Sequence, residues 1–467
     1  MRTFTFKSLF LTVLFVLLGS TAIQAADDGL ITRQITLKLD EAGTLPNKIS
    51  YDQKNLITNL KIVGKINGTD LKFIREMAGR DYYKERTDGK LSILDLSDAK
   101  IVEGGSPYTW NKYGDNEYTS NDKLGDYAFE GCSELTSLTL PSSVTSIDIA
   151  AFYGCWMLTS LTIPSSVTSI DWYAFSGCSG LTSLTIPSSV TSIGDWAFEG
   201  CSGLTSLTIP SSVTSIGDRA FEGCSGLTSL TIHSGVTSIG DQAFEGCSGL
   251  TSLTIPSGVT EIGEGVFRGC SGLTSLTIPS CVTSIGYGAF SGCSGLTSLT
   301  IPSSVTSIGK WAFAGCSGLT SLTIPSGVTE IGESTFQDCS GLTSLTIPSS
   351  VTSIGDQTFS YCRGLTSIYV YTKKLPELGS YMFTGCDAKN CTVYVPKGTI
   401  DDYKLSKFGY FEKIVEFDAS GIDKVTTSTN AKEVSRYSAN GQRLSAPAKG
   451  LNIVKYSDGS VKKVVVQ

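Results

Sequence analysis

Residues 181–203 read LTSLTIPSSVTSIGDWAFEGCSG, and this 23-residue unit decides the fold because the chain repeats it almost unchanged. Ten copies follow one another without a gap from Leu135 to Gly364. The copies begin at Leu135, Leu158, Leu181, Leu204, Leu227, Leu250, Leu273, Leu296, Leu319 and Leu342. A fixed period of about 20–50 residues is typical of proteins built from stacked structural repeats. The sequence therefore predicts a repeat solenoid.

The pattern within one unit predicts how each coil is built. Residues 184–186 alternate apolar and polar side chains, which indicates a short strand with Thr185 facing water. Pro187 ends that strand because proline cannot donate a ladder hydrogen bond. Residues 190–193 form a second short extended piece, and residues 195–199 suit a single helical or 3₁₀ turn. Each coil is thus mostly β-structure with one short helical turn.

The apolar side chains of a unit are too few to support an isolated coil. They are Leu181, Leu184, Ile186, Val190, Ile193, Ala197, Phe198 and Cys201. Ordering the backbone of 23 residues costs more conformational entropy than burying these side chains in a single coil can offset. Coils above and below must therefore shelter one another, as they do in a quasi-one-dimensional solenoid.

The charge balance argues against nucleic acids and anionic membranes as partners. The 467 residues contain 36 lysines and arginines against 43 aspartates and glutamates, which gives a net charge of −7. Binding to nucleic acid or to an acidic lipid surface requires a basic patch. The composition offers no such excess of positive charge.

Residues 1–25 read as a secretory signal peptide. Arg2 and Lys7 precede an apolar run over residues 9–18, and small residues at 21–25 offer a cleavage site. The apolar run is shorter than the about 20 residues that cross a bilayer. The sequence predicts an exported protein, located outside the cell or on its outer surface, with no membrane-spanning segment in the mature chain.

Residues 26–111 are expected to form an N-terminal capping region of divergent repeats. Strands are expected over residues 35–39, 59–62 and 91–96, and a helix over residues 70–77 with Asp70 as its N-cap. The polar stretch from 104 to 122 is read as an inserted loop. A cap is needed because a bare terminal coil would expose apolar surface and strand edges.

The solenoid itself is assigned to residues 112–388 and a C-terminal cap to residues 389–418. Residues 419–467 are read as a linker followed by a small antiparallel β module. Its strand-like pieces are joined by Asn440-Gly441 and Asp458-Gly459, which are typical hairpin turns.

The residue inventory favours a non-catalytic protein without cofactor or metal. The single histidine, His233, replaces the proline that ends the first strand in other units, and is read as a tolerated loop substitution. Asp195, Asp218 and Asp241 recur at 23-residue spacing and would form a row of like charges. Such a row could hold calcium, but calcium usually takes several oxygens that converge within one loop. The sequence contains neither a phosphate-binding loop nor a nucleophile elbow.

Most of the fourteen cysteines are expected to form a buried row of thiols. Eleven are spaced by one period: Cys132, Cys155, Cys178, Cys201, Cys224, Cys247, Cys270, Cys293, Cys316, Cys339 and Cys362. Equivalent residues of neighbouring coils lie about 4.8 Å apart with parallel side chains, whereas a disulfide needs converging Cβ atoms about 3.8 Å apart. Cys281 takes a serine position and is expected to be exposed. Cys386 and Cys391 are close enough in sequence to pair, and the alternative that they stay reduced is open.

Two sets of residues are candidates for a binding surface. The strand threonines hardly vary between units: Thr162, Thr185, Thr208, Thr231, Thr254, Thr277 and Thr300. The turn positions vary most: Trp172, Tyr173, Trp196, Arg219, Tyr287 and Trp311. Exposed aromatic and charged residues are typical of recognition surfaces, but variability also collects wherever stacking tolerates any residue. The flat, hydroxyl-rich threonine face suits adhesion through many weak contacts.

The repeated unit, LTSLTIPSSVTSIGxxAFxGCSG, resembles the BspA-like leucine-rich repeat family of bacterial surface proteins over roughly residues 112–388. The resemblance implies a leucine-rich repeat solenoid at the cell surface and adhesion to host matrix proteins or other bacteria. Residues 437–444, 450–455 and 462–466 resemble the C-terminal sorting domain of type IX secretion in Bacteroides-like bacteria.

The expected function is therefore protein–protein or cell–matrix adhesion by a secreted or surface-displayed protein. Its partner would be an extracellular macromolecule, such as a host matrix protein, another cell-surface protein or a glycan. The alternative is a glycan-binding or structural component of a surface layer.

Overall fold

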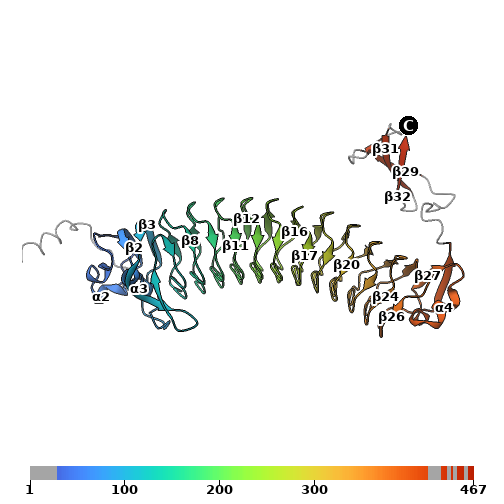
Figure 1. Cartoon of the computed structure of the whole chain (residues 1–467), viewed down its shortest axis with the longest axis horizontal. Coiled ribbons are helices and arrows are strands. Elements are labelled where there is room, and N and C mark those ends of the chain that lie inside the picture. The colour runs from blue at the N-terminus through green and yellow to red at the C-terminus, as the bar shows by residue number, and fades with distance from the viewer. Residues whose placement is uncertain (1–28, 419–432, 439–442, 445–449, 457–460, 467) are drawn as a thin grey trace, which may run out of the picture.

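The computed structural model describes residues 29–418 and the C-terminal strands between residues 433 and 466 (Figure 1). Within residues 29–418 the chain winds into a long, gently curved solenoid of stacked coils. The expected signal peptide at residues 1–25, the expected linker at 419–432 and the expected turns at Asn440-Gly441 and Asp458-Gly459 lie outside the described residues.

The solenoid begins with a parallel sheet that carries the expected N-terminal strands. These are β1 (Ile35–Leu39), β2 (Asn59–Ile66) and β3 (Ile93–Ile101). The sheet continues into two strands of the repeats, β7 (Ser137–Thr139) and β9 (Ser160–Thr162), in the order β1-β2-β3-β7-β9. Two short helices, η1 (Leu45–Asn47) and α2 (Tyr51–Lys54), follow β1. The sheet of this region therefore continues directly into the first ladder of the repeats.

The expected helix is α3 (Gly68–Met77), but its N-cap is Asn67 rather than Asp70. The Asn67 side chain accepts a hydrogen bond from the Thr69 amide at 3.0 Å. Asp70 lies one turn later, and its carboxylate accepts the Asn67 amide at 3.0 Å. This reciprocal arrangement is a capping box, in which the acidic residue occupies the third helical position.

The polar stretch 104–122 is not the inserted loop that the sequence indicated. It forms an antiparallel hairpin of β4 (Gly104–Trp110) and β5 (Asn116–Thr119). Tyr108 and Thr109 in β4 are fully buried against the rest of the N-terminal region. The loop interpretation was wrong because exposed polar residues dominate the composition of the hairpin. Its buried residues contact segments that lie far away in the sequence.

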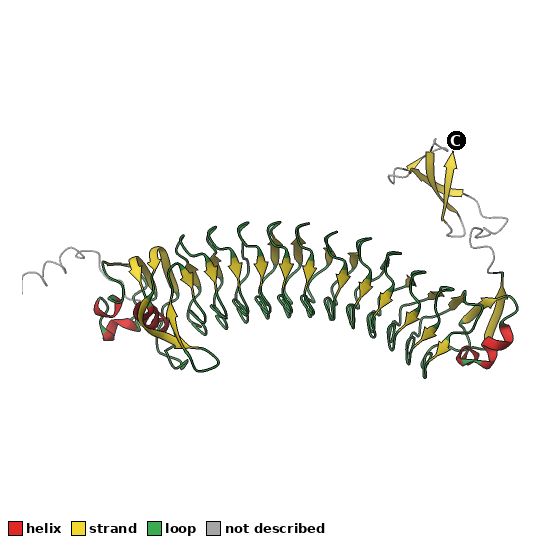
Figure 2. Cartoon of the chain, in the orientation of Figure 1, coloured by secondary structure: helices red, strands yellow, loops and turns green. Residues whose placement is uncertain are grey.

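Two parallel ladders run along the repeats in 23-residue register (Figure 2). The first ladder contains β7 (Ser137–Thr139), β9 (Ser160–Thr162), β12 (Ser206–Ile209), β14 (Ser229–Ile232), β16 (Ser252–Thr254), β18 (Ser275–Thr277), β21 (Ser321–Thr323), β23 (Ser344–Ile347) and β25 (Ser367–Val370). Within each pair, identical positions face each other, as in Thr208 against Thr231. Strand pairing is interrupted in the copies containing Leu184 and Leu299 and also between β14 and β16, which belong to separate sheets.

The second ladder consists of two-residue strands. They are β6 (Lys123–Leu124), β8 (Ser146–Ile147), β10 (Ser169–Ile170), β11 (Ser192–Ile193), β13 (Ser215–Ile216), β15 (Ser238–Ile239), β17 (Glu261–Ile262), β19 (Ser284–Ile285), β20 (Ser307–Ile308), β22 (Glu330–Ile331), β24 (Ser353–Ile354) and β26 (Glu377–Leu378). The isoleucines of these strands are buried in nearly every coil. The two strands of each coil thus enclose the apolar core on two of its sides.

The third side of each coil is a run of turns, not the expected helical or 3₁₀ turn at residues 195–199. Trp196 has a φ of +53°, which interrupts right-handed helical geometry. The amides of this segment alternate between two kinds of acceptor. Phe198 N–H donates to Ala220 of the next coil at 2.8 Å, whereas Glu199 N–H donates to Trp196 within its own turn at 3.1 Å. The turns therefore form a third ladder between coils.

Side chains from all three walls fill the core. The eleven phenylalanines from Phe129 to Phe359 are buried and stack on one another at centroid distances of 5.2–5.9 Å. Leucines of the first ladder and valines and isoleucines of the second line the remaining space. Every coil presents the same apolar shape to its neighbours, which is why the unit stacks with so little change.

The C-terminal end of the solenoid is closed by a strand, a helix and a further strand. These are β27 (Thr392–Pro396), α4 (Ile400–Leu405) with the 3₁₀ helix η2 (Lys407–Tyr410), and β28 (Lys413–Phe417). Buried Phe408 and Phe411 contact Phe383, the last ring of the phenylalanine stack. This C-terminal cap therefore combines helical segments with β28, which extends the parallel sheet.

The C-terminal β module has the antiparallel arrangement that the sequence predicted. Its strands are β29 (Glu433–Ser438), β30 (Arg443–Leu444), β31 (Gly450–Tyr456) and β32 (Val461–Val466), in the order β30-β29-β31-β32. Adjacent strands pair in antiparallel register, as in Tyr437 against Ile453.

Candidate binding surfaces

The structure places the predicted strand threonines in one exposed row along the first ladder. All seven predicted residues from Thr162 to Thr300 are exposed, and each is offset from the next by one coil. Leu207 and Ile209, on either side of Thr208, point into the core instead. This follows from strand geometry, in which successive side chains alternate between the two faces. We call this row of threonines, with the serines two positions before them, the strand face.

The strand face is hollowed where pairing in the first ladder is interrupted. One hollow of about 370 Å³ is lined by residues between Ser229 and Thr277, and another of about 380 Å³ by residues between Ser183 and Thr231. A smaller hollow of about 210 Å³ lies between Ser298 and Thr323. Hydroxyls and the partly uncovered edges of core leucines line all three. The face therefore offers shallow, weakly polar, uncharged recesses.

The predicted turn residues divide into two adjacent rows on the turn edge. Tyr173, Trp196, Arg219 and Trp311 occupy the position whose φ is positive, and two other copies have glycine there. Trp172 and Tyr287 occupy the preceding position and are more exposed, at 51% and 44%. The left-handed backbone directs consecutive side chains apart, so the sequence could not show that the six residues form two rows.

Only some of these turn residues touch one another. Tyr173 and Trp196 stack with centroids 5.0 Å apart and planes 11° from parallel. The Arg219 guanidinium lies 5.9 Å from the Trp196 ring, within the range of a cation–π contact. Tyr287 contacts Arg268 instead, at 5.6 Å. The structure thus joins Tyr173, Trp196 and Arg219 into one track and leaves Tyr287 apart from it.

The aspartate row has a structural part in joining the coils. Asp195 Oδ1 accepts the backbone N–H of Asp218 at 2.9 Å, and Asp218 Oδ1 accepts that of Asp241 at 2.9 Å. Asp241 continues the series by accepting the amide of Glu264 at 2.7 Å. One carboxylate per coil thus satisfies one amide of the next coil. In the described residues, no three potential metal-ligating side chains gather into a cluster.

The cysteines form the buried row that the period predicted. All fourteen are free, and the eleven periodic thiols are buried. Each thiol of the periodic row from Cys155 to Cys362 donates a hydrogen bond to a phenylalanine carbonyl of the preceding coil, as Cys247 does to Phe221 at 3.2 Å. Burial raises the pKa of Cys201 and of Cys270 to about 12.

The three remaining cysteines lie outside the periodic row. Cys281 is only half-exposed, because its thiol turns inward and donates to the carbonyls of Ser257 and Val259 at 3.0 and 3.2 Å. Cys386 and Cys391 are both buried and free, so the structure selects the reduced alternative. His233 is exposed on the loop after β14, as the sequence indicated.

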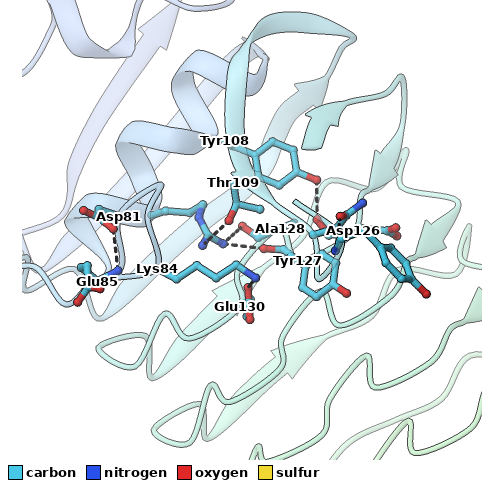
Figure 3. A network of polar contacts seen from close by, with 12 residues as sticks. Asp81, Lys84, Glu85, Tyr108, Thr109, Asp126, Tyr127, Ala128 and Glu130 are labelled. Atoms are coloured by element: carbon cyan, nitrogen blue, oxygen red, sulfur yellow. Dashed lines mark hydrogen bonds and ion pairs between the residues drawn. The ribbon is translucent and has the colours of Figure 1, made fainter. Parts of the chain in front are cut away.

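A dense network fixes the N-terminal region to the first coils (Figure 3). Lys84 and Glu130 pair at 2.7 Å with both side chains largely buried. The Lys84 ammonium also lies 4.8 Å from the Trp110 ring and 4.6 Å from the Tyr127 ring. Fully buried Arg75 donates to the carbonyls of Tyr127 and Ala128 at 2.6 and 3.1 Å.

Burial also changes the acidity of groups in this network. The hydroxyl of Tyr108 donates to the Asp126 carbonyl at 2.7 Å, and burial raises the pKa of this hydroxyl well above its usual range. Burial raises the pKa of the Asp126 carboxyl, and the charges of Asp148 and Asp171 add to this effect. The network lies between the helix, the hairpin and the first coil, so its main consequence is a rigid end of the solenoid.

A pocket beside this network was not predicted from the sequence. Its volume is about 310 Å³, and its lining includes Arg80, Arg86, Glu130, Tyr153 and Trp156. Tyr153 and Trp156 are exposed by 45% and 50%. One feature of the sequence marks this pocket: the Cys-Ser-Gly that closes most units is replaced by Cys-Trp-Met at residues 155–157. The arginines carry no comparable signal, since they come from the divergent region.

Stacked parallel coils with three walls, a periodic apolar core and an uncharged strand face define a leucine-rich repeat solenoid. The sequence model of the BspA type leucine rich repeat region matches residues 118–228, 169–297, 214–343 and 283–412. These matches together span more than half of the chain. The chain belongs to the BspA-type leucine-rich repeat family.

Similar solved structures come from several bacteria. A leucine-rich repeat protein from Bacteroides ovatus is 28% identical with a TM-score of 0.48, and the match covers 66% of this chain and 90% of that protein. A leucine rich cell surface protein from Faecalibacterium prausnitzii is 26% identical with a TM-score of 0.36, over 67% and 86% of the two chains. No curated protein matched the sequence.

The described part of the chain contains no helix with the length and apolar character needed to cross a membrane.

Proposed function

We propose that the chain is an exported, non-catalytic adhesion protein of the bacterial surface that binds an extracellular protein through its strand face. The observation that carries this proposal is the exposed threonine row, which repeats in register along the coils and encloses three shallow hollows. Many equivalent weak contacts on a rigid rod add up to strong attachment, because binding at one coil raises the effective concentration at the next.

Membership of the family supports the proposed adhesion function, since leucine-rich repeat proteins of this type are typically surface or adhesion proteins. The Faecalibacterium relative is described as a cell surface protein. A signal peptide at residues 1–25 and a sorting segment at the C-terminus would bring the chain to the cell surface.

The experiment compares two threonine rows of the same solenoid. Thr208→Glu with Thr254→Glu places charges on the strand face, whereas Thr214→Glu with Thr260→Glu places them on exposed threonines directly before second-ladder strands β13 and β17. Binding of the purified chain to a panel of immobilised host matrix proteins should fall at least about tenfold for the first pair only. Equal loss for both pairs, or binding to none of the matrix proteins, would contradict the proposal.

Glycan binding is the second candidate, and a specific observation favours it. Aromatic rings gather at the N-terminal end of the turn edge, where Trp172 is exposed and the half-buried Tyr173 and Trp196 form a stacked pair. Flat apolar rings with polar surroundings suit the faces of sugar rings.

A further inference from the structure

We propose that the pocket lined by Arg80, Arg86, Tyr153 and Trp156 binds a carboxylate-bearing sugar at the end of an oligosaccharide. This inference deepens the glycan-binding candidate and rests on it, not on the strand face. We call this pocket the arginine–aromatic pocket. Its volume of about 310 Å³ lies at the lower end of small-molecule sites, which measure about 300–1,000 Å³.

The two arginines supply positive charge that no ion pair in the described part of the chain takes up. The backbones of Arg80 and Arg86 pair as an antiparallel bridge, and a turn containing Lys84 at a φ of 65° connects them. Within residues 29–418, no carboxylate forms an ion pair with either guanidinium. The Arg80 Nε is buried and without a hydrogen-bond partner. Because both arginines line the pocket, their guanidinium groups supply donors that an anion could take up.

The one acid in the pocket does not cancel this charge. Glu130 is paired with Lys84 at 2.7 Å, and both side chains are largely buried. The positive charge of the two guanidinium groups is thus left for a ligand, in a protein whose net charge is −7. Guanidinium groups bind carboxylates through paired hydrogen bonds, which gives both strength and orientation.

The aromatic residues indicate that the anion belongs to a sugar. Tyr153 and Trp156 take positions that hold small or charged residues in most copies, and both rings face solvent at the pocket. Large exposed rings present flat apolar area, which matches the C–H faces of a pyranose. A free inorganic anion would gain nothing from them.

The track beyond the pocket indicates how the rest of the glycan runs. Tyr153 contacts Tyr173 edge to face at 6.4 Å, and Tyr173 stacks on Trp196. Glu222 pairs with Arg219 at 3.6 Å, which offsets the positive charge of the track, and Glu199 adds a negative charge near Tyr173 that would repel further acidic sugars. The chemistry therefore fits one acidic terminal sugar followed by neutral sugars, and disfavours a polyanion.

Isothermal calorimetry with sialyllactose, a glucuronic-acid-terminated trisaccharide and neutral lactose tests the proposal on the full chain. At least one acidic oligosaccharide should bind about tenfold or more tightly than lactose. Arg86→Gln and Trp156→Ala should each weaken that binding about tenfold or more. Arg363→Gln and Tyr287→Ala serve as matched controls at exposed positions outside the pocket, and they should leave it unchanged.

Several results would overturn the proposal. They are equal binding of lactose, no binding of either acidic oligosaccharide, equal loss with the control variants, and displacement of the sugar by acetate at the same concentration. Displacement by acetate would show that the arginines bind any carboxylate and that the rings contribute nothing. A chain that binds matrix proteins but no acidic sugar would refute this inference and leave the proposed adhesion through the strand face intact.

Discussion

Phe198 and Phe221 are 23 residues apart in the chain, yet their rings stack with centroids 5.2 Å apart and planes only 2° from parallel. Each ring of the row is covered by the coil before it and the coil after it. The contact that stabilises one coil is therefore always supplied by its neighbours, which explains why a single unit lacks a core of its own.

Removing one ring from the middle of the stack should be costly. Phe221→Ala leaves a cavity between Phe198 and Phe244, and we expect the free energy of unfolding to fall by about 3–5 kcal/mol. Urea denaturation followed by circular dichroism measures this change. The matched control is Tyr287→Ala, which removes an exposed ring and should cost less than about 1 kcal/mol. Similar losses for the two variants would contradict the role of the stack.

Stability should fall at alkaline pH because of the buried thiols. Burial raises the pKa of Cys201 from 9.0 to about 12, so this thiol ionises first in the unfolded chain. Its contribution is complete below about pH 9 and is lost as the pH rises toward 12. Each such thiol contributes a slope of about 1.4 kcal/mol per pH unit in that window.

Unfolding midpoints in urea between pH 7 and 11 measure the slope. Cys247→Ala should make it shallower, because Cys247 is also buried with a raised pKa. Cys281→Ala serves as the comparison at a half-exposed position. A midpoint that stays constant up to pH 11 would show that the thiols do not titrate on unfolding.

Thiol labelling should distinguish Cys281 from the buried row. Only Cys281 has a half-exposed side chain, so iodoacetamide should modify it in the native protein at pH 8 and spare the other thirteen cysteines. Mass spectrometry of the digested protein gives the labelled positions, and labelling in denaturant should reach all fourteen. Native labelling of Cys247, or a disulfide between successive copies, would contradict the stacked arrangement.

Replacing Arg75 should loosen the N-terminal end alone. Arg75→Ala removes the donors to the carbonyls of Tyr127 and Ala128 and leaves a buried cavity. We expect a loss of about 2–4 kcal/mol. Hydrogen exchange should accelerate around residues 68–135 and stay unchanged in the central coils, because each coil contacts only its neighbours. Uniform acceleration along the chain would argue for a single cooperative unit.

In the aspartate row, replacement by asparagine should cost less stability than replacement by alanine. Asp218→Asn keeps an oxygen that can accept the Asp241 amide, whereas Asp218→Ala leaves that amide without its acceptor at a cost of about 1 kcal/mol. Asp218→Asn should be neutral or slightly stabilising at low salt, because it removes one of several neighbouring like charges. Thermal unfolding measures both. A clear rise in the melting temperature of the unchanged protein on adding calcium would instead support a metal-binding row.

The sequence was most informative where one unit repeats. The buried leucines, the exposed threonines such as Thr208 and the row of free thiols all follow from period and alternation, because equivalent residues must occupy equivalent places in stacked coils. It was less informative in the N-terminal region, where the hairpin β4–β5 was read as a loop. No repeat constrains that segment, and its buried residues contact partners far away in the chain.

The candidate surfaces likewise combine features that the sequence predicts with features that depend on the tertiary structure. Trp172 and Tyr173 are neighbours in sequence, but the left-handed backbone at Tyr173 assigns them to separate rows. Arg80 and Trp156 are 76 positions apart and line one pocket, since the N-terminal region folds against the second coil.

By itself, the sequence determined a solenoid, its period, its core residues and its exposed strand row, because these depend on which side chains recur and at what spacing. Only the tertiary structure decided the path of the turn, the use of the aspartates as acceptors and the pocket of arginines and aromatic rings. Those features depend on backbone torsions and on contacts between segments that no repeat connects, and such information is spread over the whole chain.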